Sequence, residues 1–187
     1  GRQSISNYMN NHIGHFADGS QAFAKALFFG GVTRRFPGLR VALLEGGADW
    51  GAHVYAHLVD HWEKRNRNAV QHYNPANADI DLLADLFERY GADLLQGRPV
   101  DKSTLLADSL GVSALPHSRD PQGDELDDFA AAGIESVEDI RTRWVDSFYF
   151  GSEADDRTVG AAFNERVNPL NVKLNAIWSS DVGLSLI

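Results

Sequence analysis

The chain has 187 residues, of which 43% are hydrophobic and 23% charged, so it can bury a sizeable core as one domain. Its formal net charge of −9 argues against a nucleic-acid partner, because binding to a phosphate backbone needs a clustered basic surface. It has no cysteine, which excludes disulfides, thiolate metal sites and a catalytic thiol. It also has no apolar run near the roughly 18 residues of a membrane-spanning helix. We therefore expect a cytoplasmic protein without a membrane partner.

The first part of the chain predicts a helix, a strand and a second helix. Apolar and small residues recur at helical spacing over 20–35, and Pro37-Gly38 stops that helix. The apolar run 41–44 predicts a strand covered on both faces, and Gly46-Gly47 allow a tight turn into a long amphipathic helix over 50–72. Glu45 then lies at the carboxyl end of the strand, either as a turn carboxylate or as a site residue.

The middle of the chain reads as helix and loop. Asp79 can cap a helix over 80–90, and Gly91 lies where a C-terminal glycine is expected. A further short helix is expected near 103–110. The segment 111–128 lacks periodicity and predicts a loop.

The last part again alternates helices with strands. Ser136 opens a capping-box pattern for a helix through Trp144. Apolar runs at 148–150 and 174–178 predict two more buried strands, separated by a helix around 158–163. Helices alternating with strands in this way predict an α/β fold with a parallel sheet.

Four segments carry a resemblance to a known family. They are NNHIGHFADG, FFGGVTRRFPGLRVALLEGGADW, FYFGSEADD and AIWSSDVG, in this order along the chain. Together they resemble the carboxyl-terminal half of amidohydrolase-related enzymes, which are metal-dependent (β/α)8 barrels that include hydrolases and nonoxidative decarboxylases. The likeness runs from Ser4 to about Gly183. It implies one domain, 1–187, that forms a partial (β/α)8 TIM barrel from the last three βα units.

The chain is shorter than a complete barrel of this kind, which needs about 250 residues. The paired histidines that the family places after its first strand have no counterpart here, and the sequence opens on Gly1-Arg2 without an initiator methionine. We therefore expect part of a larger polypeptide. By itself this chain should bind a metal weakly.

The resemblance also implies which acids act. Asp181 stands where the family has the aspartate after the eighth strand, so it is expected to bind a divalent metal, zinc first and manganese second, and to carry a proton. Glu45 stands where many relatives have histidine, and it is expected to be catalytic toward substrate or metal. Glu153 edges the implied pocket and is expected to bind substrate. The three acids are expected to converge at one end of the sheet.

Other polar residues keep two interpretations. His12 and His15 are spaced i,i+3, which could place both on one helical turn; His15 is the candidate for substrate or metal, with capping or packing as the alternative. Asp155 and Asp156 could support the site or cap the following helix. A row of histidines four residues apart borders the apolar stripe of the long helix, and a packing or surface role is favoured over metal binding; its members are His53, His57 and His61.

The sequence thus predicts a metal-dependent hydrolase acting on a small carboxylated or cyclic substrate. One alternative is a nonoxidative decarboxylase of the same family. Another is a barrel remnant without catalysis, because unpaired strand edges and apolar surface promote association. The expected partners are a small-molecule substrate and either a second copy of the chain or the missing barrel half.

Overall fold

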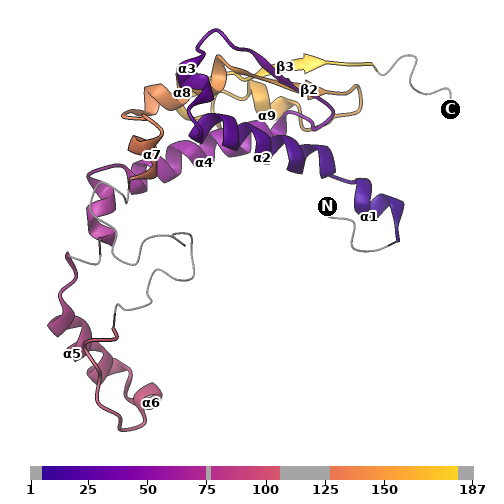
Figure 1. Ribbon diagram of the computed structural model, residues 1–187. Helices are drawn as coiled ribbons and strands as arrows, with labels where there is room; N and C mark the ends of the chain where they lie inside the picture. Colours follow the sequence, from indigo (N-terminus) through magenta and orange to yellow (C-terminus); the bar gives the residue numbers. More distant parts are fainter. Residues whose placement is uncertain (1–5, 75–76, 106–126, 181–187) are drawn as a thin grey trace. The chain divides into compact units, whose positions relative to one another are not determined.

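The computed structural model describes residues 6–74, 77–105 and 127–180, which divide into two compact units. The sheet unit lies within 1–64 and 129–187, and the helical unit lies within 65–128 (Figure 1). The sheet unit contains three strands, β1 (Val41–Leu43), β2 (Phe148–Ser152) and β3 (Asn175–Trp178). Its α-helices are α1 (Tyr8–His12), α2 (His15–Phe29), α3 (Val32–Arg35), α4 (Asp49–Arg65), α7 (Asp128–Ala131), α8 (Val137–Val145) and α9 (Gly160–Phe163), and a 3-10 turn, η4 (Pro169–Asn171), precedes β3.

The three strands form a parallel sheet in the order β1-β2-β3. Leu43 lies beside Phe150, which lies beside Ala176, so these three side chains share one face. The predicted α/β fold with parallel strands is confirmed. All three predicted strands form, and each begins or ends within two residues of its predicted bounds.

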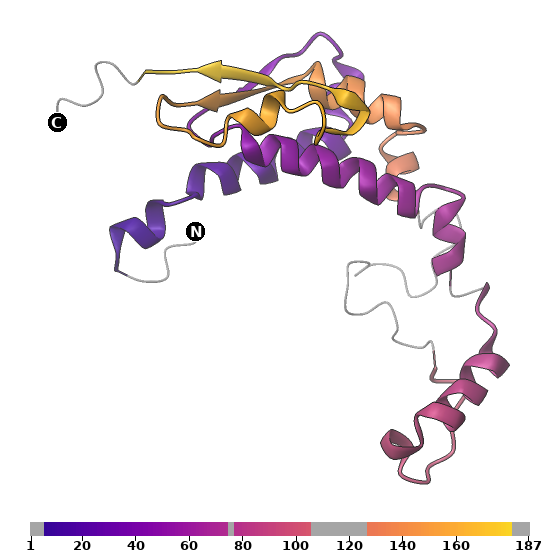
Figure 2. The same cartoon turned by 180° about the vertical axis from the view of Figure 1, so that it is seen from behind.

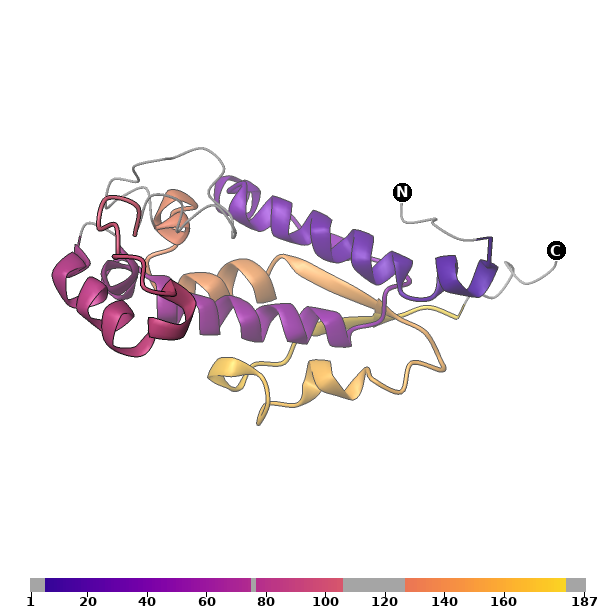
Figure 3. The same cartoon turned by 90° about the horizontal axis from the view of Figure 1, so that it is seen from below.

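One face of the sheet is covered by helices, and this face holds the core. Figures 2 and 3 show α2 and α4 running side by side along it. Trp144 of α8 is fully buried and packs near the rings of Phe28, Phe148 and Phe150, edge-on to Phe28 and tilted to the other two. It donates its indole N–H to the Gly51 carbonyl oxygen at 3.2 Å. One indole therefore joins α2, α4 and α8 to β2 through both packing and a satisfied buried donor.

The opposite face of the sheet is open in the part of the chain that the structure describes. Ala42 and Leu44 are exposed, Tyr149 and Ile177 are half-buried, and none of them belongs to the core cluster. The prediction that the first strand is covered on both faces is therefore wrong. Consecutive right-handed crossovers that always step in the same direction place their helices on one side of a sheet, which accounts for the asymmetry.

Two predicted helices differ in length from the observed ones. The helix expected over 20–35 begins earlier, at His15, and breaks into α2 and α3 at Gly31, whose φ of 71° is left-handed. The helix expected to reach residue 72 stops at Arg65, and a 3-10 turn, η1 (Ala69–Tyr73), follows it. Apolar spacing alone did not locate either break.

The helical unit contains α5 (Ile80–Tyr90) and α6 (Ala92–Leu95) in addition to η1. Asp79 caps α5 as predicted, accepting the Leu82 backbone N–H at 2.9 Å, and Gly91 closes its C-terminus. Several apolar side chains along α5 are exposed, including Leu86, Phe87 and Tyr90. The helix predicted near 103–110 and the loop predicted over 111–128 lie almost entirely outside the described residues.

The capping signal before α8 is confirmed. The Ser136 hydroxyl accepts the Asp139 backbone N–H, and the Asp139 carboxylate accepts the Ser136 backbone N–H at 2.9 Å. The helix predicted over 158–163 forms only from Gly160. Within the described residues, no helix is both long and apolar enough to cross a membrane.

Candidate functional site

A small hollow lies at the carboxyl ends of the three strands, where parallel α/β sheets place their ligands. It encloses about 70 Å³. Ligand pockets usually reach 300–1,000 Å³, so the described residues hold no more than a few waters or one small group there. Its lining residues are Leu44, Glu45, Gly151, Ser152, Glu153, Ile177, Trp178 and Ser179. Two of the three predicted acids, Glu45 and Glu153, thus lie beside the same hollow.

Glu45 lies directly after β1 in an unusual backbone conformation. Its φ is 60°, in the left-handed region that costs a non-glycine residue roughly 1–2 kcal/mol. Gly47 follows with φ 75°, so the chain turns sharply into α4. The Glu45 side chain is exposed. Strained residues persist mainly where the surroundings impose them, and they gather at functional sites, so this conformation favours a site residue over a simple turn carboxylate.

The strand ends are held together by a close approach of backbones at Gly151. A Cβ atom at Gly151 would lie 2.8 Å from the Leu44 Cα and 3.1 Å from the Glu45 nitrogen, so only glycine fits without a shift. The Gly151 carbonyl oxygen accepts the Gly47 backbone N–H at 3.0 Å. On the other side of β2, Ser179 donates its backbone N–H to the Ser152 carbonyl oxygen at 3.0 Å. The floor of the hollow is therefore backbone from all three strands.

Asp156 connects two loops behind the hollow. Its carboxylate accepts the Thr158 backbone N–H at 2.8 Å, the Thr158 hydroxyl at 2.7 Å and the Ser152 hydroxyl at 3.2 Å. It also accepts the backbone N–H of Ala48, in the loop between β1 and α4. Partial burial opposes ionisation, but these donors outweigh it and lower the pKa of the Asp156 carboxyl below its usual value. Asp156 is held as a carboxylate that ties the Glu45 loop to the Glu153 loop.

The structure rejects the capping alternative for the two acids after β2. The residue before α9 is Val159, and no side chain caps that helix. Asp155 is exposed, and Asp156 makes the loop contacts described above. Glu153 is half-buried, and its carbonyl oxygen accepts the Asp156 backbone N–H at 3.2 Å.

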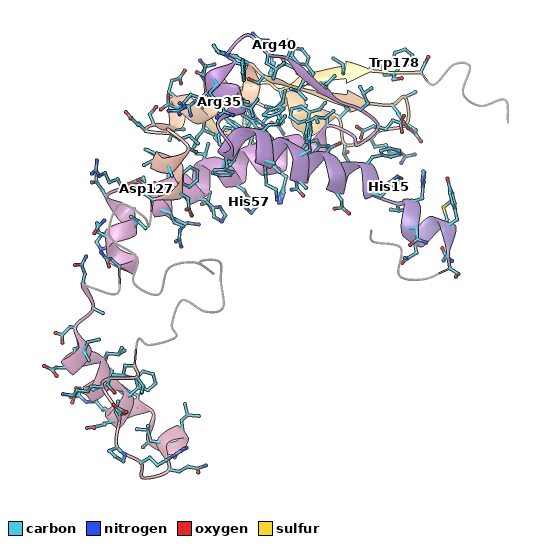
Figure 4. All side chains as sticks on the ribbon, in the orientation of Figure 1. His15, Arg35, Arg40, His57, Asp127 and Trp178 are labelled. Atoms are coloured by element: carbon cyan, nitrogen blue, oxygen red, sulfur yellow. The ribbon has the colours of Figure 1, made fainter. Side chains whose placement is uncertain are left out.

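His12 and His15 do not share a helical turn, because Gly14, with φ 76°, separates α1 from α2. His15 lies near the start of α2 (Figure 4), and its Nδ1 is 2.5 Å from the His12 carbonyl oxygen. Its ring lies 4.1 Å from that of Phe16. Ala17, two residues on, packs against the turn that follows Glu45: a Cβ added to Gly46 would lie 3.2 Å from the Ala17 Cα. His15 is outside the lining of the hollow but close in sequence to a residue that supports it.

Asp181, the predicted metal ligand, lies outside the described residues, and its role stays a prediction. Among the described residues, no three or more histidine, aspartate and glutamate side chains are arranged to hold a metal ion. Glu45 and Glu153 supply oxygen donors of the type that hard divalent ions prefer, but they are too few to complete a site. The fit to a metal is therefore partial.

The sequence interpretation missed two contributors to this site. Gly151 and Ser152 were included in the strand-end segment, yet neither was singled out, although a glycine directly after an aromatic run indicates a close backbone approach. The Asp156 contact with Ala48 joins residues more than a hundred positions apart, and no local pattern reports it. His53, His57 and His61 are all exposed along α4, and their expected packing or surface role stays a prediction.

Comparisons with protein-family models, with curated proteins and with solved structures gave no match for this chain.

Proposed function

We propose that the hollow at the strand ends belongs to a metal-dependent hydrolase site of the amidohydrolase-related type, acting on a small carboxylated or cyclic substrate. The observation that carries the proposal is the strained Glu45 at the rim of this hollow, with Glu153 directly after the neighbouring strand. The strand order β1-β2-β3, with the helices of the described residues on one face, is also the arrangement of consecutive units in a (β/α)8 barrel. In that arrangement the open face of the sheet would line the barrel interior.

The residues have separate roles in this proposal. Asp181 follows β3 by three residues and would bring a third acid toward the hollow. A divalent ion held there by Asp181 and Glu45 would supply Lewis acidity toward a carbonyl group. Glu45, exposed at the rim, could accept a proton from an attacking water or from substrate. Trp178, 67% exposed, offers an apolar surface against which a ring could pack.

A turnover assay with matched variants tests the proposal. The protein is incubated with Zn²⁺ or Mn²⁺ and a panel of lactones, cyclic amides and aromatic carboxylic acids, and both ring opening and carbon dioxide release are measured. Asp181→Asn should abolish the turnover of any substrate found, whereas Asp93→Asn, an exposed aspartate on α6, should leave it unchanged. Carbon dioxide release without hydrolysis would identify the decarboxylase alternative. Turnover that survives Asp181→Asn would refute both.

The open sheet face favours a second candidate function, association without catalysis. Parallel sheets are normally covered on both faces, yet here Leu44 is 56% exposed on the uncovered side. A second copy of the chain could cover this face. Sedimentation velocity tests this association. The sedimentation coefficient of the parent chain should rise with protein concentration, whereas the Leu44→Glu variant should stay monomeric. A monomeric parent at all concentrations would reject it.

A further inference from the structure

The exposed histidine row on α4 has a geometry that its spacing alone does not reveal. His57 and His61 lie four residues apart on one face of the helix, with ring centroids 5.6 Å apart and ring planes inclined by 31°. Figure 4 shows His57 on the helix layer, away from the sheet. The row is therefore separate from the hollow at the strand ends.

The spacing of the His57 and His61 rings is close to, but slightly wider than, what a shared ion requires. Zinc–nitrogen bonds are about 2.0–2.1 Å, which places an ion about 3.2 Å from each ring centroid. Two rings that meet at the ion at about 90–110° would then have centroids about 4.5–5.2 Å apart. The observed 5.6 Å is within about half an ångström of that range, and exposed rings can close such a gap by small rotations about their side-chain bonds.

A hydrogen bond sets the tautomer of His61. Its Nδ1 lies 2.7 Å from the His57 carbonyl oxygen, and because a carbonyl oxygen can only accept, Nδ1 carries the proton. In the neutral imidazole the lone pair is then on Nε2, the ring nitrogen farther from the backbone. Metal-binding histidines commonly donate their second ring N–H to a backbone carbonyl in this way.

The charges around the pair are mixed. The Asp60 carboxylate lies 4.0 Å from His61 Nδ1 and 2.7 Å from the Lys64 ammonium group. Lys64 neutralises this carboxylate, so the pair is left as a two-imidazole site completed by water. No third protein ligand joins it among the described residues, which agrees with the lack of any larger ligand group there.

We propose that His57 and His61 form a surface site for a borderline transition-metal ion such as Cu²⁺, Ni²⁺ or Zn²⁺. Imidazole pairs four residues apart on one helical face bind such ions, and the affinity should follow the general order in which Cu²⁺ exceeds Zn²⁺ and Mg²⁺ does not compete. The site does not depend on the enzymatic proposal.

Isothermal titration of protein without an affinity tag, in the Asp181→Asn background, tests the site apart from the hollow. Cu²⁺ and Zn²⁺ should each bind once per chain at micromolar concentration, and Mg²⁺ should not bind. His57→Gln and His61→Gln should each weaken Zn²⁺ binding at least tenfold, because each leaves one imidazole of the pair. Glutamine is chosen because it also favours helix, and circular dichroism checks that α4 still forms in both variants.

Two control variants make the result decisive. His53→Gln alters the next member of the row, whose ring lies 4.3 Å from that of His57 and which forms the competing pair, and His72→Gln alters an exposed histidine in the helical unit. Both should bind Zn²⁺ within about threefold of the parent. The proposal is overturned if His61→Gln binds as the parent does, if His53→Gln causes the loss instead, or if no ion binds.

Discussion

Replacing Gly151 by alanine tests whether the strand ends are held by backbone contact. The added Cβ would lie 2.8 Å from the Leu44 Cα, 3.1 Å from the Glu45 nitrogen and 3.2 Å from the Leu43 carbonyl oxygen, and all three are backbone atoms that cannot rotate away. Overpacking of this kind costs typically 1–3 kcal/mol. The shift would also strain the bond from the Gly47 N–H to the Gly151 carbonyl oxygen, worth about 1 kcal/mol. We expect a loss of about 2–4 kcal/mol in the free energy of unfolding.

The matched control is Gly19→Ala. Gly19 lies inside α2, is exposed, and would place its Cβ in open space, so alanine should stabilise the helix by about 0.5–1 kcal/mol. Urea denaturation followed by circular dichroism measures both variants against the parent. A Gly151→Ala protein as stable as the parent would show that β1 and β2 do not approach as described.

Three further substitutions probe the strain, the carboxylate and the buried hydroxyl. Glu45→Gly should raise the free energy of unfolding by about 1 kcal/mol by relieving a φ of 60°, whereas Glu45→Ala keeps the strain; equal stabilities of the two variants in urea would contradict this. Asp156→Asn should cost about 2 kcal/mol at neutral pH, because an amide cannot accept all the donors around it. Since the folded pKa of Asp156 is lowered, its stabilisation is present above about pH 4 and is lost as the pH falls further, so the two urea curves should converge in acid. Among the described residues the buried Tyr55 hydroxyl has no hydrogen-bond partner, and burial raises the pKa of Tyr55 to about 12 from 10.0. The folded state then keeps the Tyr55 proton to a higher pH than the unfolded chain does, so the free energy of unfolding should fall by about 2–3 kcal/mol between pH 10 and 12. Tyr55→Phe should remove that fall at no cost near neutral pH. If the variant shows the same loss of stability in alkali as the parent, Tyr55 is not the group responsible.

Local signals in the sequence predicted the local structure well. Asp79 and Ser136 each occupy a helix N-cap, and Gly91 closes α5, because caps depend on backbone groups within four residues. The strands were found from their apolar runs. These interactions are short in sequence, so a single chain carries enough information to place them.

What depended on distant contacts was not predicted. The break at Gly31 and the end of α4 at Arg65 interrupt runs whose apolar spacing continues to look helical. The exposure of Ala42 follows from which helices reach the sheet, which no spacing within β1 encodes. The Asp156 carboxylate accepts the Ala48 backbone N–H, and only the folded chain brings these two residues together.

The candidate site was predicted in part for the same reason. Glu45 and Glu153 follow strands, and parallel strands bring their carboxyl ends to one edge, so topology alone placed them together. The expected helical turn through His12 and His15 failed because Gly14 adopts a left-handed φ between them. A glycine tolerates both signs of φ, and the sequence does not say which one it takes.

Manganese binding is the sharpest test for a metal site at the strand ends. Mn²⁺ prefers carboxylate oxygens and binds imidazole pairs more weakly than Cu²⁺, Ni²⁺ or Zn²⁺ does. It therefore distinguishes the strand-end site from the α4 histidines. Free Mn²⁺ is counted by electron paramagnetic resonance for the parent, Glu45→Gln and Asp181→Asn. We predict weak but saturable binding of one Mn²⁺ per chain in the parent, weaker binding in Glu45→Gln and none in Asp181→Asn. No bound ion in the parent, or equal binding in all three, would contradict this prediction.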